Sequence, residues 1–155
     1  NLIYSGTLER CPHLRPILSH MGGTLPYLRW RLHECFPGAI CASERGQTPR
    51  ELIAQRDLPV APYVSAAWDS LTQTPDAYLK RFYYDTALAV DPINFDAVCA
   101  LAPEHVLFGS DAFYASKRHG QLFTAAIQNY FTKAHQQEAV NRGNAQTLFP
   151  HFARP

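Results

Sequence analysis

The sequence lacks several features that would place the protein in a broad functional class. Its 14 Lys and Arg residues nearly balance its 13 Asp and Glu residues, and the basic residues form no stripe, so nothing favours binding to nucleic acid. No apolar run approaches the roughly 20 residues that a membrane-spanning helix needs. The N-terminus also lacks the charged start and apolar core of a signal peptide. We therefore expect a cytoplasmic protein that binds neither nucleic acid nor membranes.

Cysteine and paired metal-ligand motifs are also scarce. The four cysteines, at positions 11, 35, 41 and 99, match no Cys-x-x-Cys metal or redox pattern. We expect them to be buried, reduced thiols of an intracellular protein. The seven histidines include no His-x-His pair.

The composition that is present is typical of a globular protein. Apolar residues make up 46% and charged residues 17% of the 155 residues, which suffices for one domain with a sizeable core. The first residue is Asn1 and not Met, and the chain opens directly in a helical-looking stretch over 2–10. We expect an incomplete chain, although processing also produces such a start.

Helix starts are easy to recognise. Thr48-Pro49, Thr74-Pro75 and Asp91-Pro92 each combine a capping residue with a proline at the first helical position. Amphipathic spacing after these pairs and near the C-terminus predicts five helices. They cover 51–55, 76–81, 93–101, 117–134 and 136–148.

Three short apolar segments alternate with these helices, over 15–19, 81–85 and 105–109. Each is too short for a helix and is followed by small or polar residues, which is typical of a buried parallel strand. The alternation predicts an α/β fold with a parallel sheet. The proline-rich connection over 37–73 is long enough to be functional or to form an interface.

Polar residues directly after the strands are the candidate site residues, because active sites of parallel α/β folds lie at the carboxyl ends of the strands. His20 precedes two glycines and is either a metal ligand or acid–base group, or a capping or loop histidine. Asp111 is either a ligand for a divalent metal or a helix N-cap. For Asp85 and Thr86 a capping role is favoured over a place in the site.

An ordered set of motifs resembles the amidohydrolase-2 branch of the amidohydrolase superfamily, in particular the aminocarboxymuconate-semialdehyde and resorcylate decarboxylase group. The motifs run over nearly the whole chain. They are Ser5-Gly6-Thr7-Leu8-Glu9-Arg10-Cys11-Pro12, Leu18-Ser19-His20-Met21-Gly22-Gly23-Thr24-Leu25-Pro26-Tyr27, Phe82-Tyr83-Tyr84-Asp85-Thr86-Ala87, Leu107-Phe108-Gly109-Ser110-Asp111, and Asn144-Ala145 with Leu148-Phe149. The family often has Tyr-Pro after the Asp, where this chain has Ala112-Phe113-Tyr114.

The resemblance implies a (β/α)8 barrel in which residues 1–155 are the C-terminal half of a single domain, about strands six to eight with their helices. It implies that Asp111 ligates a divalent metal, Zn or Mn, whose other ligands precede Asn1. It makes His20 the catalytic histidine beside the metal. Arg31 would bind a substrate carboxylate, sometimes across a subunit interface, and a homodimer is expected. The segment alone is then expected to be inactive.

By this resemblance, the favoured function is metal-dependent, non-oxidative decarboxylation of a small carboxylic acid. One alternative is a metal-dependent hydrolase of a C–O or C–N bond with the same parts. An alternative of another class is an inactive barrel fragment that serves as a binding or assembly module, because the segment lacks most metal ligands.

Overall fold

The computed structural model describes residues 2–34 and 71–153. They fall into two compact units, each described here by itself. The helical unit comprises 2–14, 28–34 and 71–79, and the sheet unit comprises 15–27 and 80–153. The predicted helix over 51–55 and most of the proline-rich connection lie outside the described residues.

The helical unit contains α1 (Thr7–Arg10), α2 (Arg29–Glu34) and α6 (Pro75–Leu79). Leu8 and Leu79 are fully buried and form part of its core. The predicted cap of α6 is confirmed, because the hydroxyl of Thr74 accepts a hydrogen bond of 3.3 Å from the amide of Ala77. The helical-looking stretch over 2–10 is helical only in its second half, and Gly6, at φ 68°, marks the start of α1.

A polar cluster around Glu9 connects segments of the helical unit. Its carboxylate oxygen Oε1 accepts hydrogen bonds from the amide of Thr72 at 3.2 Å and from the hydroxyl of the same residue at 2.9 Å. The buried Tyr78 hydroxyl donates to the same oxygen. One carboxylate therefore connects α1 with the turn before α6, two segments far apart in the sequence.

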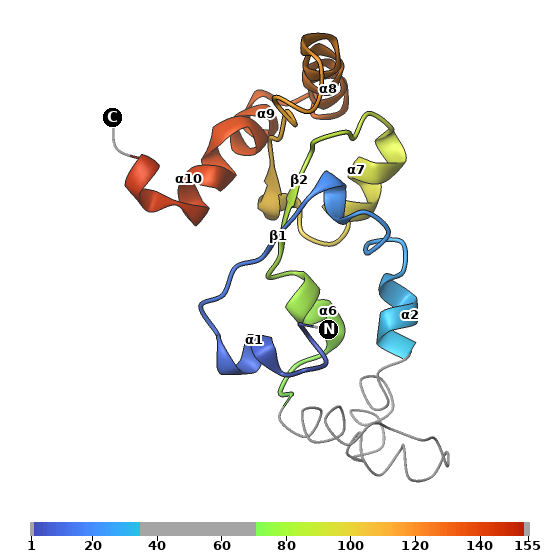
Figure 1. The fold of residues 1–155 in the computed structure, drawn as a ribbon, viewed down its shortest axis with the longest axis vertical. Helices are drawn as coiled ribbons and strands as arrows, with labels where there is room; N and C mark the ends of the chain where they lie inside the picture. Colours follow the sequence, from blue (N-terminus) through green and yellow to red (C-terminus); the bar gives the residue numbers. More distant parts are fainter. Residues whose placement is uncertain (1, 35–70, 154–155) are drawn as a thin grey trace. The chain divides into compact units, whose positions relative to one another are not determined.

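The sheet unit is built on three parallel strands, β1 (Ile17–Leu18), β2 (Tyr83–Asp85) and β3 (Val106–Leu107), in the order β1-β2-β3 (Figure 1). The α/β class, the three strands and their parallel pairing are thus as predicted. The expected burial is wrong for β1, where Ile17 is exposed and Leu18 is half-buried. The strands are shorter than the predicted segments. Pro16 has no amide hydrogen for a ladder, and the amide of Phe108 leaves the ladder to donate to the carbonyl of Val140 at 2.9 Å.

Helices and short turns connect and follow the strands. They are η1 (His20–Gly22), α7 (Pro92–Cys99), η2 (Pro103–His105), α8 (Lys117–Tyr130), α9 (Ala134–Glu138), the π-helical η3 (Ala139–Gly143), α10 (Asn144–Leu148) and η4 (Pro150–Phe152). The Asp91 cap of α7 is confirmed, since its carboxylate accepts a hydrogen bond of 2.9 Å from the amide of Ile93. The last predicted helix is present as three consecutive segments, α9, η3 and α10.

One predicted helix, over 117–134, is too long. The backbone leaves helical geometry at Phe131, whose side chain is buried and meets Phe95 edge-on at 5.9 Å. The amide side chain of Gln137 then donates to the Phe131 carbonyl at 2.7 Å. Packing against α7 therefore ends α8 where the residue pattern alone continues it.

The expectation of buried cysteines is wrong for Cys11, which is exposed, while Cys99 is half-buried. Cys11 directly follows α1 at its C-cap and precedes Pro12, so it lies in a surface turn. Cys35 and Cys41 lie outside the described residues. In the part of the chain that the structure describes, no helix is long and apolar enough to cross a membrane.

Candidate active site

His20 stands directly beyond β1, where the chain turns sharply. His20 and Met21 both adopt left-handed backbone conformations, with φ of 58° and 55°, and Gly22 and Gly23 follow at 77° and 57°. Left-handed geometry is uncommon for residues with a side chain, so two such residues in succession need support from their surroundings. Met21 gives part of that support, because its side chain is buried.

The imidazole of His20 is exposed, and one of its two ring nitrogens is engaged. Nδ1 lies 3.2 Å from the carbonyl oxygen of Ala87. Because a carbonyl oxygen only accepts, Nδ1 carries the hydrogen, and in the neutral ring the lone pair is on Nε2. A ring held in this form can take up a proton at Nε2 and release it again.

Asp85, at the end of β2, is bound to the backbone beside His20. Its oxygen Oδ1 accepts hydrogen bonds of 3.0 Å from the amides of His20 and Ala87. The structure thus brings together the ends of β1 and β2 and gives Asp85 the capping role favoured from its position.

Thr86 joins the end of β2 to the end of β3. The residue is fully buried, and its hydroxyl accepts a hydrogen bond of 3.0 Å from the amide of Gly109. The same hydroxyl donates to the Gly109 carbonyl at 3.5 Å. Its role is therefore structural. Neighbouring Tyr84 is no candidate base either, because burial raises the pKa of its hydroxyl above the ordinary value of 10.0.

Asp111 follows β3 and is half-buried, with a left-handed φ of 52°. Its backbone carbonyl accepts hydrogen bonds from Tyr114 and Ala115, at 3.2 and 2.7 Å. The alternative of a helix cap is wrong, because Ser116 caps α8 by accepting from the amide of His119. Among the described residues the Asp111 carboxylate has no hydrogen-bond or ion-pair partner, which leaves its oxygens available for a ligand.

The described residues around Asp111 do not form a complete set of metal ligands. Within 2–34 and 71–153 there is no group of three or more His, Cys, Asp and Glu side chains placed to hold a metal ion. A catalytic metal typically takes about three protein ligands. The unpartnered carboxylate of Asp111 fits one place in such a set, and the described residues do not complete it.

Arg31 lies in the other compact unit, the helical one, on α2. The residue is exposed. Its role as a carboxylate-binding residue therefore stays a prediction.

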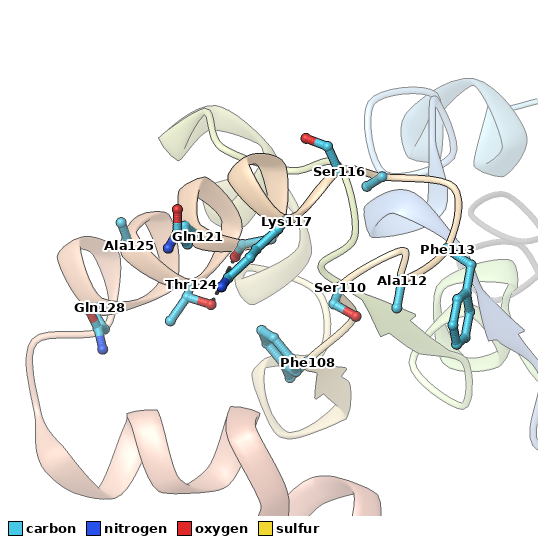
Figure 2. A pocket seen from close by; sticks show the side chains of 12 residues that line it. Phe108, Ser110, Ala112, Phe113, Ser116, Lys117, Gln121, Thr124, Ala125 and Gln128 are labelled. Carbon is cyan, nitrogen blue, oxygen red and sulfur yellow. Dashed lines mark hydrogen bonds between the residues drawn. The ribbon is translucent and has the colours of Figure 1, made fainter.

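A cavity of about 560 Å³ lies between the segment that follows β3 and one face of α8 (Figure 2). Phe108 and Ser110 line it from the strand side, and Lys117, Thr124 and Gln128 line it from α8 (Figure 2). Its volume is in the range of small-molecule sites. Ser110 directly precedes Asp111, so the cavity begins beside the candidate ligand. No motif in the sequence indicates this cavity, because it results from the position of α8.

The two residues after Ala112 form an exposed aromatic loop. Phe113 and Tyr114 are fully exposed, and Phe113 has a left-handed φ of 76°. This is the place where the chain departs from the Tyr-Pro of the family pattern.

Comparison with known proteins identifies the family. The family model described as amidohydrolase matches residues 1–151 of the chain. This chain belongs to the amidohydrolase family. The amidohydrolase chain is 33% identical to a 6-methylsalicylic acid decarboxylase from Penicillium expansum over 98% of its own length and 40% of that protein. A second 6-methylsalicylic acid decarboxylase, from Aspergillus aculeatus, is 30% identical over 99% of the chain and 41% of its own length.

The fold is also similar to that of solved decarboxylase structures. A dihydroxybenzoic acid decarboxylase from Polaromonas sp. JS666, solved with manganese and the inhibitor 2-nitroresorcinol, superposes with a TM-score of 0.67 at 20% identity. The match covers 99% of this amidohydrolase chain and 39% of that structure. The chain thus spans about 40% of the length of the relatives that it matches, and its fold fits a portion of their barrel.

Proposed function

We propose that this amidohydrolase chain forms strands six to eight of a single (β/α)8 barrel domain in a metal-dependent decarboxylase of small aromatic carboxylic acids. The observation that carries the proposal is the arrangement at the strand ends. Within residues 2–34 and 71–153, a histidine with one free ring nitrogen follows β1, and a carboxylate without a partner follows β3 of the same parallel sheet. The 33% sequence identity to a 6-methylsalicylic acid decarboxylase supports decarboxylation over the other reactions of the family.

Asp111 is the residue of this chain that would hold the metal. When bound, a divalent ion such as manganese or zinc supplies positive charge that holds oxygen atoms of the substrate. The remaining ligands would come from residues outside this segment, because the described residues do not form a full set. The carboxylate of Asp111 suits either ion, since both accept oxygen ligands.

His20 would manage the proton. Non-oxidative decarboxylation breaks a C–C bond and leaves an electron pair on a carbon atom, which must take up a proton. The Nε2 atom of His20 can carry that proton, while Nδ1 keeps its own hydrogen and donates it to the Ala87 carbonyl.

Arg31 would orient the substrate carboxylate, because a guanidinium can hold both carboxylate oxygens at once. We further propose a homodimer, in which such an arginine can act on the site of the partner subunit. The exposure of Arg31 on α2 is compatible with either arrangement.

The test is an assay of the full-length protein, expressed with the coding sequence upstream of Asn1. We expect metal-dependent release of CO2 from 6-methylsalicylic acid or a dihydroxybenzoic acid, measured together with the corresponding phenol by chromatography. Cleavage of ester or amide substrates without CO2 release would instead establish the hydrolase alternative. A protein that retains no metal and turns over neither class would be a binding or assembly module.

A further inference from the structure

We propose that Asp85 is a positioning residue, which sets the ring orientation and the tautomer of His20. The inference rests on the proposed function only in that His20 is taken to transfer the proton. It assigns Asp85 a role beyond that of an ordinary strand-end cap. The role rests on a network of three hydrogen bonds that links Asp85, Ala87 and His20.

Two of the three hydrogen bonds in this network share one carboxylate oxygen. Oδ1 of Asp85 accepts from the backbone amides of both His20 and Ala87, each at 3.0 Å. The carbonyl of Ala87 in turn lies 3.2 Å from Nδ1 of the His20 ring. Asp85 therefore holds both ends of the contact that fixes the imidazole, namely the backbone of His20 and the residue whose carbonyl accepts its hydrogen.

The backbone conformation of His20 makes this support necessary. A left-handed conformation is unfavourable for a residue with a side chain, and both His20 and Met21 adopt it, at φ 58° and 55°. A bond from an amide to an ionised carboxylate is about twice as strong as one to a neutral acceptor. The charge of Asp85 thus favours the turn that carries the imidazole.

Close packing keeps the Asp85 carboxylate in place. A methyl group added at Gly109 would lie 3.2 Å from Oδ1 and Cβ of Asp85 and from the amide nitrogen of Ala87. The Gly109 amide itself is held by the hydroxyl of Thr86 at 3.0 Å. The segment directly after β3 therefore packs against this hydrogen-bond network, and the Asp85 carboxylate has little room to move.

The experiment compares Asp85→Ala and Asp85→Asn with Asp91→Ala in the full-length protein. Asp91 is the matched control, because its carboxylate also accepts a hydrogen bond from a backbone amide, that of Ile93, but does not contact His20. The tautomer of His20 is measured by nitrogen NMR on protein labelled at histidine. Turnover number and KM are measured on the same samples.

In the unmodified protein we expect His20 protonated at Nδ1. In Asp85→Ala we expect a mixture of tautomers, a loss of turnover of about 100-fold, and a KM within about threefold, because misplacing a reacting group has effects of that order. Asp85→Asn keeps an amide oxygen as acceptor and should restore most of the Nδ1 form. Asp91→Ala should leave tautomer and turnover unchanged.

Should Asp85→Ala not fold, hydrogen exchange in Asp85→Asn decides. The amides of His20 and Ala87 should exchange about tenfold faster than in the unmodified protein, since a charged acceptor is replaced by a neutral one. The exchange rate of the Ile93 amide should not change.

Unchanged exchange at His20 and Ala87, or an Nδ1 form that persists in Asp85→Ala, would overturn the proposal. If the tautomer shifts but no decarboxylation is found in any variant, the positioning role stands and the proposed function fails.

Discussion

The side-chain amide of Asn144 donates a hydrogen bond of 2.8 Å to the carbonyl oxygen of Val106, 38 residues earlier in the chain. The asparagine is buried on α10, and Val106 is the fully buried first residue of β3. This bond attaches the C-terminal helical segment to the strand that leads to Asp111. A second bond, from the Phe108 amide to the Val140 carbonyl at 2.9 Å, runs in parallel with it.

Asn144→Ala should therefore destabilise the sheet unit. We expect a loss of about 1–3 kcal/mol in the free energy of unfolding, because the substitution leaves a buried carbonyl without its donor. Denaturant titration of the full-length protein measures the effect. Asn141→Ala is the control, since Asn141 is exposed on the neighbouring π-helical segment and should lose less than about 0.5 kcal/mol. Equal losses in the two variants would contradict this role for Asn144.

The two glycines after Met21 should differ in their tolerance of a side chain. A methyl group at Gly22 would lie 3.0 Å from two ring carbons of the buried Tyr84, whereas at Gly23 it would have no neighbour within 4 Å. Both residues have a positive φ, a conformation that an alanine adopts only with strain, so both substitutions should destabilise the fold. Gly22→Ala should cost about 1–3 kcal/mol more than Gly23→Ala, owing to the added overpacking. Thermal and denaturant unfolding measure the stability of the two variants. If the Gly23→Ala protein is the less stable of the two, contact with Tyr84 does not limit which side chains this turn tolerates.

Asp111 and His20 should separate metal binding from proton transfer. In the full-length protein, Asp111→Asn should lose metal and activity together, because the carboxylate is the proposed ligand. His20→Ala should retain the metal and lose about 10²–10⁴-fold in turnover, the usual contribution of a positioned acid or base. Metal content is measured by elemental analysis beside the decarboxylation assay. A His20→Ala protein without metal would make His20 a ligand and reverse this assignment.

Tyr78 should make the stability of the helical unit depend on alkaline pH. Burial and its hydrogen bond to Glu9 raise the pKa of its hydroxyl above the ordinary value of 10.0. Above pH 10 the unfolded chain loses this proton more readily than the folded chain, so the free energy of unfolding falls as pH rises. Below pH 10 the contribution is complete. Tyr78→Phe should therefore show a shallower decline above about pH 10, measured by denaturant titration at each pH.

The exposed Tyr114 provides the comparison for that measurement. Tyr114→Phe should follow the steep decline of the unmodified protein, because its ring is not desolvated on folding. A Tyr78→Phe protein whose pH dependence matches that of Tyr114→Phe would show that the Tyr78 proton does not contribute.

Local pattern in the sequence predicted the three strands and most of the helices in their order, but it did not predict α2. The apolar segments near Leu18, Tyr84 and Leu107 indicate buried parallel strands, and Thr74 and Asp91 indicate helix starts, because burial and capping depend on nearest neighbours in the chain. The same logic placed His20 and Asp111 beyond strand ends. It also marked Asp85 and Thr86 as capping residues.

Only the tertiary structure decided where those elements end and what the polar groups contact. α8 ends at Phe131 because that side chain packs against Phe95, which is distant in sequence. The partner of the His20 ring is the backbone carbonyl of Ala87, a group that every residue possesses and that no sequence pattern marks. Which carbonyl faces the imidazole depends on the pairing of β1 with β2, so the protonation form of the proposed catalytic group follows from the packing of strands that are about 65 residues apart in the chain.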